Sequence, residues 1–274
     1  MSPNNFGSLI FPGWSTATTA LTGAAVPHPW YEGGLTQIFW NVVGGVIVAL
    51  MFEIIPWAKK KFKKRAFRAI FGEDIGSRQF HLIYAQFILK NLTPPDPAPY
   101  RKPTNPIWIF SISHPVSLCE VRAAKYLTGS IAAQDLLSPI LTADEDITST
   151  LDVSFVSFGG PGSNLKSNDL NNCQNALIDF GNNNFISTAT GSPVISFAPG
   201  FDYGIIIKVH PPSFPDRTWI TCAGLSEWGT SGAAWYLANR WEEIHRYAGD
   251  APFAIIVRVR HGQDESAEPI YRTR

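Results

Sequence analysis

Two glycine-rich segments contain the residue types best suited to bind a small ligand. One reads FGGPGSN at 158–164, and the other reads GLSEWGTSG at 224–232. Glycine allows a backbone to approach a ligand closely and to adopt positive φ angles that turn N–H groups inward. The hydroxyl and amide side chains that follow can cap a helix, whose positive end attracts an anion such as phosphate. The simpler interpretation is that both segments only connect a strand tightly to a helix.

The candidates for ligand binding come from these segments and from SHPVS at 113–117. Lys166 would add a mobile cation near a phosphate, and Trp228 would stack on a base. The full set is Ser113, Ser117, Gly159, Gly160, Gly162, Ser163, Asn164, Lys166, Gly224, Trp228, Gly229, Thr230 and Ser231. The Thr230 and Ser231 hydroxyls would point at the start of a helix. Neither glycine-rich segment is a dinucleotide fingerprint or a P-loop, so the pattern does not identify the ligand.

Two carboxylates are candidates for catalysis. Glu227 lies inside the second glycine-rich segment, where it could hold a ribose hydroxyl or act as a general base. Equally, it could complement the positive end of the helix that follows. Asp264 comes after the last predicted strand and could close the same rim, whereas 144–146 (DED) are expected to form a solvated turn. The histidines lack the spacing of metal ligands, so no metal or other cofactor is predicted.

An α/β domain must position these residues. We expect strands at 80–89, 107–113, 151–158, 194–197, 203–209, 218–225 and 252–259, and helices at 116–137, 163–180 and 229–247. Alternating strand–loop–helix units are typical of a mostly parallel sheet covered by helices, which binds ligands outside the carboxyl ends of its strands. The sequence therefore predicts one Rossmann-like α/β domain over 76–274.

An apolar run from Leu35 to Ile55 precedes this domain. Its length of about 21 residues would cross a hydrocarbon core of about 30 Å as a helix, which Pro56 is expected to end. Gly44 and Gly45 would let two such helices pack closely. The alternatives are a buried core helix or a signal peptide, but a signal peptide has its positive charge before the apolar run and not after it.

A basic segment follows, with Lys59, Lys60, Lys61, Lys63, Lys64, Arg65 and Arg68. Cationic flanks stay in the cytoplasm, so we expect a single-pass protein of the inner membrane with its N-terminus outside and its domain cytoplasmic. The segment could also lie along an anionic leaflet as an amphipathic helix, or serve only as a topology signal. The expected organisation is an external tail (1–34), a transmembrane helix (35–57), a juxtamembrane segment (58–75) and the domain.

Charge and cysteine content exclude other classes of protein. The chain has 22 basic and 22 acidic residues. Because the basic segment contains seven of the positive charges, the domain that follows it is mildly acidic. This charge argues against nucleic acid as a partner, because nucleic-acid binding depends on neutralising phosphates. Three scattered cysteines are too few for a disulfide framework.

Three segments resemble an uncharacterised group of bacterial membrane-anchored proteins, to which no activity is attached. They are FGGPGSN (158–164), CAGLSEWGTSGAAWYLANRW (222–241) and RVRHGQDESA (258–267), and the resemblance covers residues 80–270. By loop placement, the expected fold is also similar to Rossmann-like nucleotide sensors and nucleotide hydrolases of bacterial signalling and antiphage systems.

Three hypotheses follow from the sequence. The first is a membrane-anchored sensor that binds a nucleotide or a related phosphorylated ligand. The second is a membrane-anchored nucleotide or N-glycosidic hydrolase that uses Glu227, supported by Asp264. The third is a membrane scaffold that oligomerises through its helix and binds no ligand.

Overall fold

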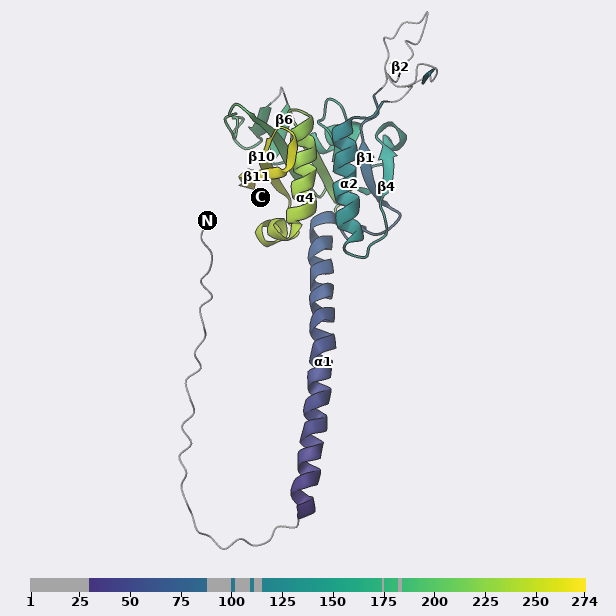
Figure 1. Cartoon of the computed structure of the whole chain (residues 1–274). Helices are drawn as coiled ribbons and strands as arrows, with labels where there is room; N and C mark the ends of the chain where they lie inside the picture. Colours follow the sequence, from purple (N-terminus) through teal and green to yellow (C-terminus); the bar gives the residue numbers. More distant parts are fainter. Residues whose placement is uncertain (1–29, 88–99, 102–108, 111–114, 174, 182–183) are drawn as a thin grey trace, which may run out of the picture. The chain divides into compact units, whose positions relative to one another are not determined.

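The computed structural model describes residues 30–87, 100–101, 109–110, 115–173, 175–181 and 184–274 (Figure 1). The chain forms two compact units, Met1–Pro56 and Trp57–Arg274. Helix α1 (Trp30–Phe71) contributes residues to both.

The expected end of the helix at Pro56 is wrong, because α1 continues through this residue to Phe71. Proline removes one backbone hydrogen bond from a helix. Beyond Pro56, packing stabilises the helix: Phe67, Ile70 and Phe71 are fully buried in the core of the second unit. Phe67 and Ile70 therefore contact the protein interior and cannot lie on a leaflet.

In the first unit, α1 exposes a continuous apolar surface. Its exposed large apolar side chains are Ile38, Phe39, Trp40, Val42, Val46, Val48, Met51, Phe52, Ile54 and Ile55. Among the described residues, α1 is the one helix long and apolar enough to cross a membrane. Water is a poor solvent for such a surface, and hydrocarbon is a good one.

The second unit is built on a seven-stranded mixed sheet. Its spatial order is β11 (Gln263–Thr273), β10 (Phe253–Arg260), β8 (Phe201–Val209), β9 (Trp219–Gly224), β5 (Ser154–Phe158), β1 (Phe80–Tyr84) and β4 (Ile140–Ala143). Strands β9, β5, β1 and β4 pair in parallel, whereas β9–β8, β8–β10 and β10–β11 pair antiparallel. An α/β sheet with flanking helices is thus confirmed, with more antiparallel pairing than expected.

Helices and a hairpin cover the two faces of the sheet. The end of α1 packs on one face with α2 (Leu118–Ala132) and α4 (Glu227–Ala248), which lie side by side in Figure 1. The other face carries α3 (Leu165–Asn171) and the hairpin of β6 (Ile178–Gly181) and β7 (Asn184–Ser187). Alternate residues of β10 show the division, since Ile255 and Val257 face the first layer and Ala254 and Ile256 the second.

Several expected elements differ from the structure. The stretch 194–197 is not a strand, and α3 ends at Asn171, well before 180. Most of the expected strand at 107–113 lies outside the described residues. Two of its residues form β3 (Ile109–Phe110), which pairs with the short strand β2 (Tyr100–Arg101). Strand β11 and the 3₁₀ turn η1 (Glu145–Ile147) were not expected. The polar sequence of β11 suits its place at the edge of the sheet.

Candidate functional site

The carboxyl ends of β1 and β5 form the switch point of the sheet. These strands are neighbours, but the helix that follows β1, α2, packs on one face, and the helix that follows β5, α3, packs on the other. Where the chain leaves two adjacent strands in opposite directions, a crevice opens, and open α/β sheets bind ligands in such crevices.

Glu120, in the first turn of α2, is buried at this switch point with an exposed fraction of 2%. Its Oε2 accepts a hydrogen bond from the backbone N–H of Ala85 at 2.7 Å, just beyond β1. Its Oε1 lies 3.0 Å from the position that a Cβ atom on Gly159 would take, and Gly159 has a φ of +91°. Burial raises the pKa of Glu120 to about 8; the hydrogen bond from Ala85 opposes this shift, and the charge of Asp144 adds to it. Glu120 is therefore mostly a neutral carboxylic acid at pH 7.

An apolar groove of about 560 Å³ adjoins Glu120. Its lining includes Tyr84, Val116, Glu120, Val121 and Leu141, and at the far end Lys125 and Gly129, which also line a second cavity. Small-molecule sites are typically apolar cavities of about 300–1,000 Å³ with a few polar groups, often including one of perturbed pKa. The groove and Glu120 together have this composition.

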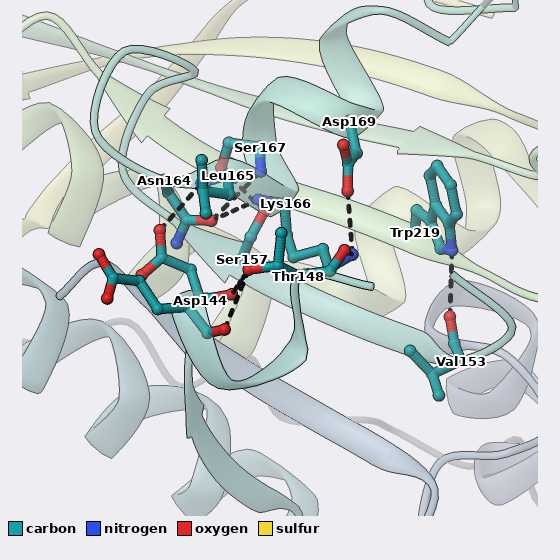
Figure 2. Close-up of polar contacts among 11 residues, drawn as sticks. Asp144, Thr148, Val153, Ser157, Asn164, Leu165, Lys166, Ser167, Asp169 and Trp219 are labelled. Atoms are coloured by element: carbon teal, nitrogen blue, oxygen red, sulfur yellow. Dashed lines mark hydrogen bonds and ion pairs between the residues drawn. The ribbon is translucent and has the colours of Figure 1, made fainter. Parts of the chain in front are cut away.

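Protein side chains already cap the N-terminus of α3. Asn164 Oδ1 accepts hydrogen bonds from the backbone N–H groups of Lys166 and Ser167, at 2.9 and 3.3 Å (Figure 2). Asp144 accepts a third from the N–H of Leu165 at 2.9 Å, and its exposed fraction of 2% shows that it is not part of a solvated turn. The amides that a phosphate would use at this helix are occupied.

Lys166 is also occupied. Its ammonium is fully buried, donates to the backbone carbonyl of Thr148 at 3.0 Å and pairs with Asp169 at 2.9 Å (Figure 2). The prediction that Lys166 is a mobile cation is therefore wrong, because its ammonium is bonded within the protein and links α3 to the preceding loop. Ser163 caps no helix, since its hydroxyl donates to the carbonyl of Gly160.

Asp202, the second residue of β8, caps α4. Its Oδ2 accepts hydrogen bonds from the N–H of Gly229, at 2.8 Å, and from the hydroxyl of Ser226. A carboxylate at this position complements the helix dipole and repels a phosphate. Thr230, which was expected to face a bound anion, donates its hydroxyl to the carbonyl of Ser226 at 3.4 Å.

The glycines of the second segment bring α4 against the sheet. A Cβ atom on Gly224 would lie 2.2 Å from the backbone nitrogen of Thr230, and one on Gly229 would lie 2.1 Å from the carbonyl oxygen of Tyr203. In the first segment, a Cβ atom on Gly160 would lie 2.6 Å from the ring of Phe180, whereas one on Gly162 would meet open space. Packing explains Gly160, Gly224 and Gly229, and Gly159 makes room for Glu120.

Arg122 joins the starts of α2, α4 and β11. Its guanidinium carbon lies 4.1 Å from the centroid of the Trp228 ring, its Nε donates to Asp264 at 3.1 Å, and its Nη2 donates to the hydroxyl of Ser231 at 3.1 Å. Asp264 also accepts hydrogen bonds from Tyr126, at 2.9 Å, and from Ser231, at 2.5 Å. With an exposed fraction of 3%, Asp264 is a fixed partner of these groups and does not present a free base.

Glu227 is the exposed first residue of α4. Burial raises the pKa of the nearby Cys119 thiol, and the charge of Glu227 adds to that effect. Ser117 is the N-cap residue of α2, but its hydroxyl contacts Cys119 Sγ at 3.0 Å and caps no backbone N–H. Ser113 lies outside the described residues.

Three buried carboxyl groups of this edge were not among the predicted site residues: Glu120, Asp144 and Asp202. Ser117 and Glu120 have the spacing of a capping box, which was the available signal for a helix start. Instead of returning to the Ser117 backbone, Glu120 bonds to the end of β1. Asp144 and Asp202 act on helices that begin more than twenty residues away, and no local pattern indicates such a partner.

Within the described part of the chain, no cluster of His, Cys, Asp and Glu side chains could hold a metal ion. Comparisons of the chain with protein-family models, curated proteins and solved structures found no match.

Proposed function

We propose that this protein is a membrane-anchored sensor whose Rossmann-like domain binds a small ligand of the nucleotide class in the crevice beside Glu120. The observation that carries the proposal is a buried, neutral carboxylic acid at the switch point of the sheet, next to an apolar groove. The helix α1 would anchor the domain at the inner membrane, with the domain in the cytoplasm.

A neutral carboxylic acid both donates and accepts hydrogen bonds, as the edge of a nucleobase does. Because Oε2 of Glu120 already accepts from Ala85, its proton is best placed on Oε1, on the side of Gly159. A heterocycle with a hydrogen-bond acceptor would accept this proton from Glu120, and the apolar faces of the heterocycle would fill the groove.

The electrostatics of the edge orient the ligand. Asp144, Asp202 and Asn164 occupy the helix starts, so a phosphate is disfavoured at α3 and α4. We therefore assign the ring and sugar to the crevice and direct the phosphate toward Arg122, at the rim. Trp228, whose ring is held by Arg122, offers a stacking surface there.

Two helices connect the crevice with the end of α1. Helices α2 and α4 start at the carboxyl edge of the sheet and pack against α1, where the ring centroids of Phe67 and Trp241 lie 5.0 Å apart. Ligand contacts that shift α2 relative to α4 would bias the packing around Phe67, which is how we expect occupancy to reach the helix.

Thermal unfolding of the full-length protein in detergent, with a panel of nucleosides, nucleotides and cyclic nucleotides, tests the proposal. We expect at least one compound to raise the melting temperature of the wild type and of Glu145→Gln, an exposed control. Glu120→Gln keeps the shape but loses the hydroxyl donor, so the shift should shrink. A panel without effect on the wild type, or an equal shift in Glu120→Gln, contradicts the proposal.

A hydrolase is the second candidate, favoured by the pKa of Glu120 of about 8, which suits a general acid. Glu227, exposed at the start of α4, would be the base. Asp264 is not available as a supporting catalytic group, because it already accepts hydrogen bonds from Arg122, Tyr126 and Ser231. Product analysis with NAD and nucleoside phosphates decides: the hydrolase predicts turnover that Glu227→Gln abolishes, and turnover that survives this change removes Glu227 as its catalyst.

A further inference from the structure

A second cavity, of about 570 Å³, lies at the opposite end of α2 from Glu120. The C-terminal half of α2, the middle of α4 and the basic part of α1 form its walls. Four cations line it, Lys63, Lys125, Arg240 and Arg246, together with the carboxylates of Glu242 and Glu243.

The two carboxylates have partners, which leaves the cavity positive. Glu242 pairs with Lys63 at 2.9 Å, and Glu243 pairs with Arg272, outside the lining. Within the described residues, Lys125, Arg240 and Arg246 form no ion pair, and all three are exposed to solvent. Three cations around one cavity suit a phosphate group.

The walls of the cavity are held in place. Helix α4 departs from helical geometry at Arg240, which has φ −117° and ψ 16°. Next to this kink, the hydroxyl of Ser130 in α2 donates to the carbonyl of Ala238 at 2.7 Å. The hydrogen bond joins α2 to α4, so the two helices that carry Lys125 and Arg240 are linked without a ligand.

We propose that this cavity binds the phosphate headgroup of an anionic phospholipid. Lys63 belongs to the basic segment that follows the apolar part of α1, and Lys59, Lys61 and Arg65 of this segment are also exposed. Lys60 and Lys64 bind Asp135 instead, through an ion pair and its backbone carbonyl. The choice of a lipid over a soluble phosphate rests on the proposed membrane anchoring, because α1 then brings Lys63 to the leaflet surface.

Native mass spectrometry of the full-length protein in detergent, titrated with phosphatidylglycerol or phosphatidylcholine, measures the interaction. We expect phosphatidylglycerol to bind more tightly, and the double variant Arg240→Gln/Arg246→Gln to weaken it by roughly tenfold or more, at about 1 kcal/mol per cation. Arg78→Gln/Arg260→Gln removes two exposed arginines outside the lining and should leave the affinity unchanged. Glu242→Gln frees Lys63 and should tighten binding.

Glycerol 3-phosphate and inorganic phosphate form the second arm. If either soluble anion binds as tightly as the lipid, the proposal that the ligand is a lipid is wrong. If the two double variants bind the lipid with equal affinity, the proposal that this cavity is the binding site is wrong. Alkaline extraction of membranes tests the anchoring separately: release of the protein refutes the anchor, whereas the affinity measured in detergent still decides the cavity.

Discussion

Among single residues, Glu120 is a carboxyl group buried almost completely inside the domain. Its carboxyl group is enclosed by the end of β1, Gly159 and the start of α2, with one hydrogen bond from Ala85. A carboxylate in such surroundings is disfavoured, so the group keeps its proton. The raised pKa of Glu120, which would let it donate a hydrogen bond to a ligand, therefore also makes the stability of the domain depend on pH.

Glu120 should lower the stability of the domain as pH rises. Its pKa is about 8 in the folded chain and 4.5 as an ordinary carboxyl, so between these values the folded state binds more protons than the unfolded state. Stability from this group is greatest below pH 4.5 and is lost toward pH 8, by on the order of a few kcal/mol. Glu120→Gln should flatten this fall. Unfolding followed at pH 5 and pH 8 measures it, and an unchanged pH profile in the variant contradicts the assignment.

Asp264→Asn should destabilise the domain by about 3 kcal/mol, because it leaves Arg122 half-buried without its charge partner. Glu268→Gln breaks the more exposed pair with Arg258 and should cost less than about 1 kcal/mol. Denaturant unfolding compares the two variants. Similar effects would mean that Asp264 is not the fixed partner described above.

At the scale of elements, the contact between β8 and the start of α4 depends on glycine. Gly229→Ala would place a Cβ atom 2.1 Å from the carbonyl oxygen of Tyr203, so we expect a loss of about 3 kcal/mol or more. In Gly129→Ala the Cβ atom meets nothing within 4 Å, and alanine should stabilise α2 by about 0.5–1 kcal/mol. Melting temperatures that move in the same direction would contradict this account of α4.

The helix α4 and strand β10 show what the sequence could predict. The apolar face of 229–247 and the run 252–259 follow the helix and buried-strand patterns, and both elements lie within two residues of the expected bounds. The polar strand β11 has no such pattern, since one edge of it faces solvent. Strand β4 is only four residues long, and only its last residue, Ala143, is buried.

The glycine-rich segments show where prediction of the site failed. Their place at the carboxyl edge followed from the order of strands and helices, and the structure puts both segments there. Their role did not follow, because Asp144, just after β4, and Asp202, in β8, cap the helix starts from distant parts of the chain. Tertiary contacts of this kind decide whether a helix start is open to a ligand.

At the scale of the molecule, Lys208 holds the end of α1 against the domain. Its fully buried ammonium donates to the carbonyl of Ala69 at 2.6 Å and pairs with Asp250 at 2.9 Å. Burial lowers the pKa of Lys208, and Asp250 opposes this shift. Lys208→Met should loosen α1, so trypsin should cut the basic segment about tenfold faster, as expected for a loss of about 1.4 kcal/mol. Arg260→Met, an exposed change at the end of β10, is the control; equal cleavage of both variants would contradict the role of Lys208.

Identification of the small molecules retained by the purified full-length protein shows whether a ligand occupies the crevice beside Glu120. Mass spectrometry of the extracted ligand should find one nucleotide-class compound near stoichiometry in the wild type and in Glu145→Gln, the exposed control. Glu120→Ala and Trp228→Ala should lose it. A compound retained equally by all four proteins, or a wild type that retains none and binds none of the nucleotide panel, would contradict the account.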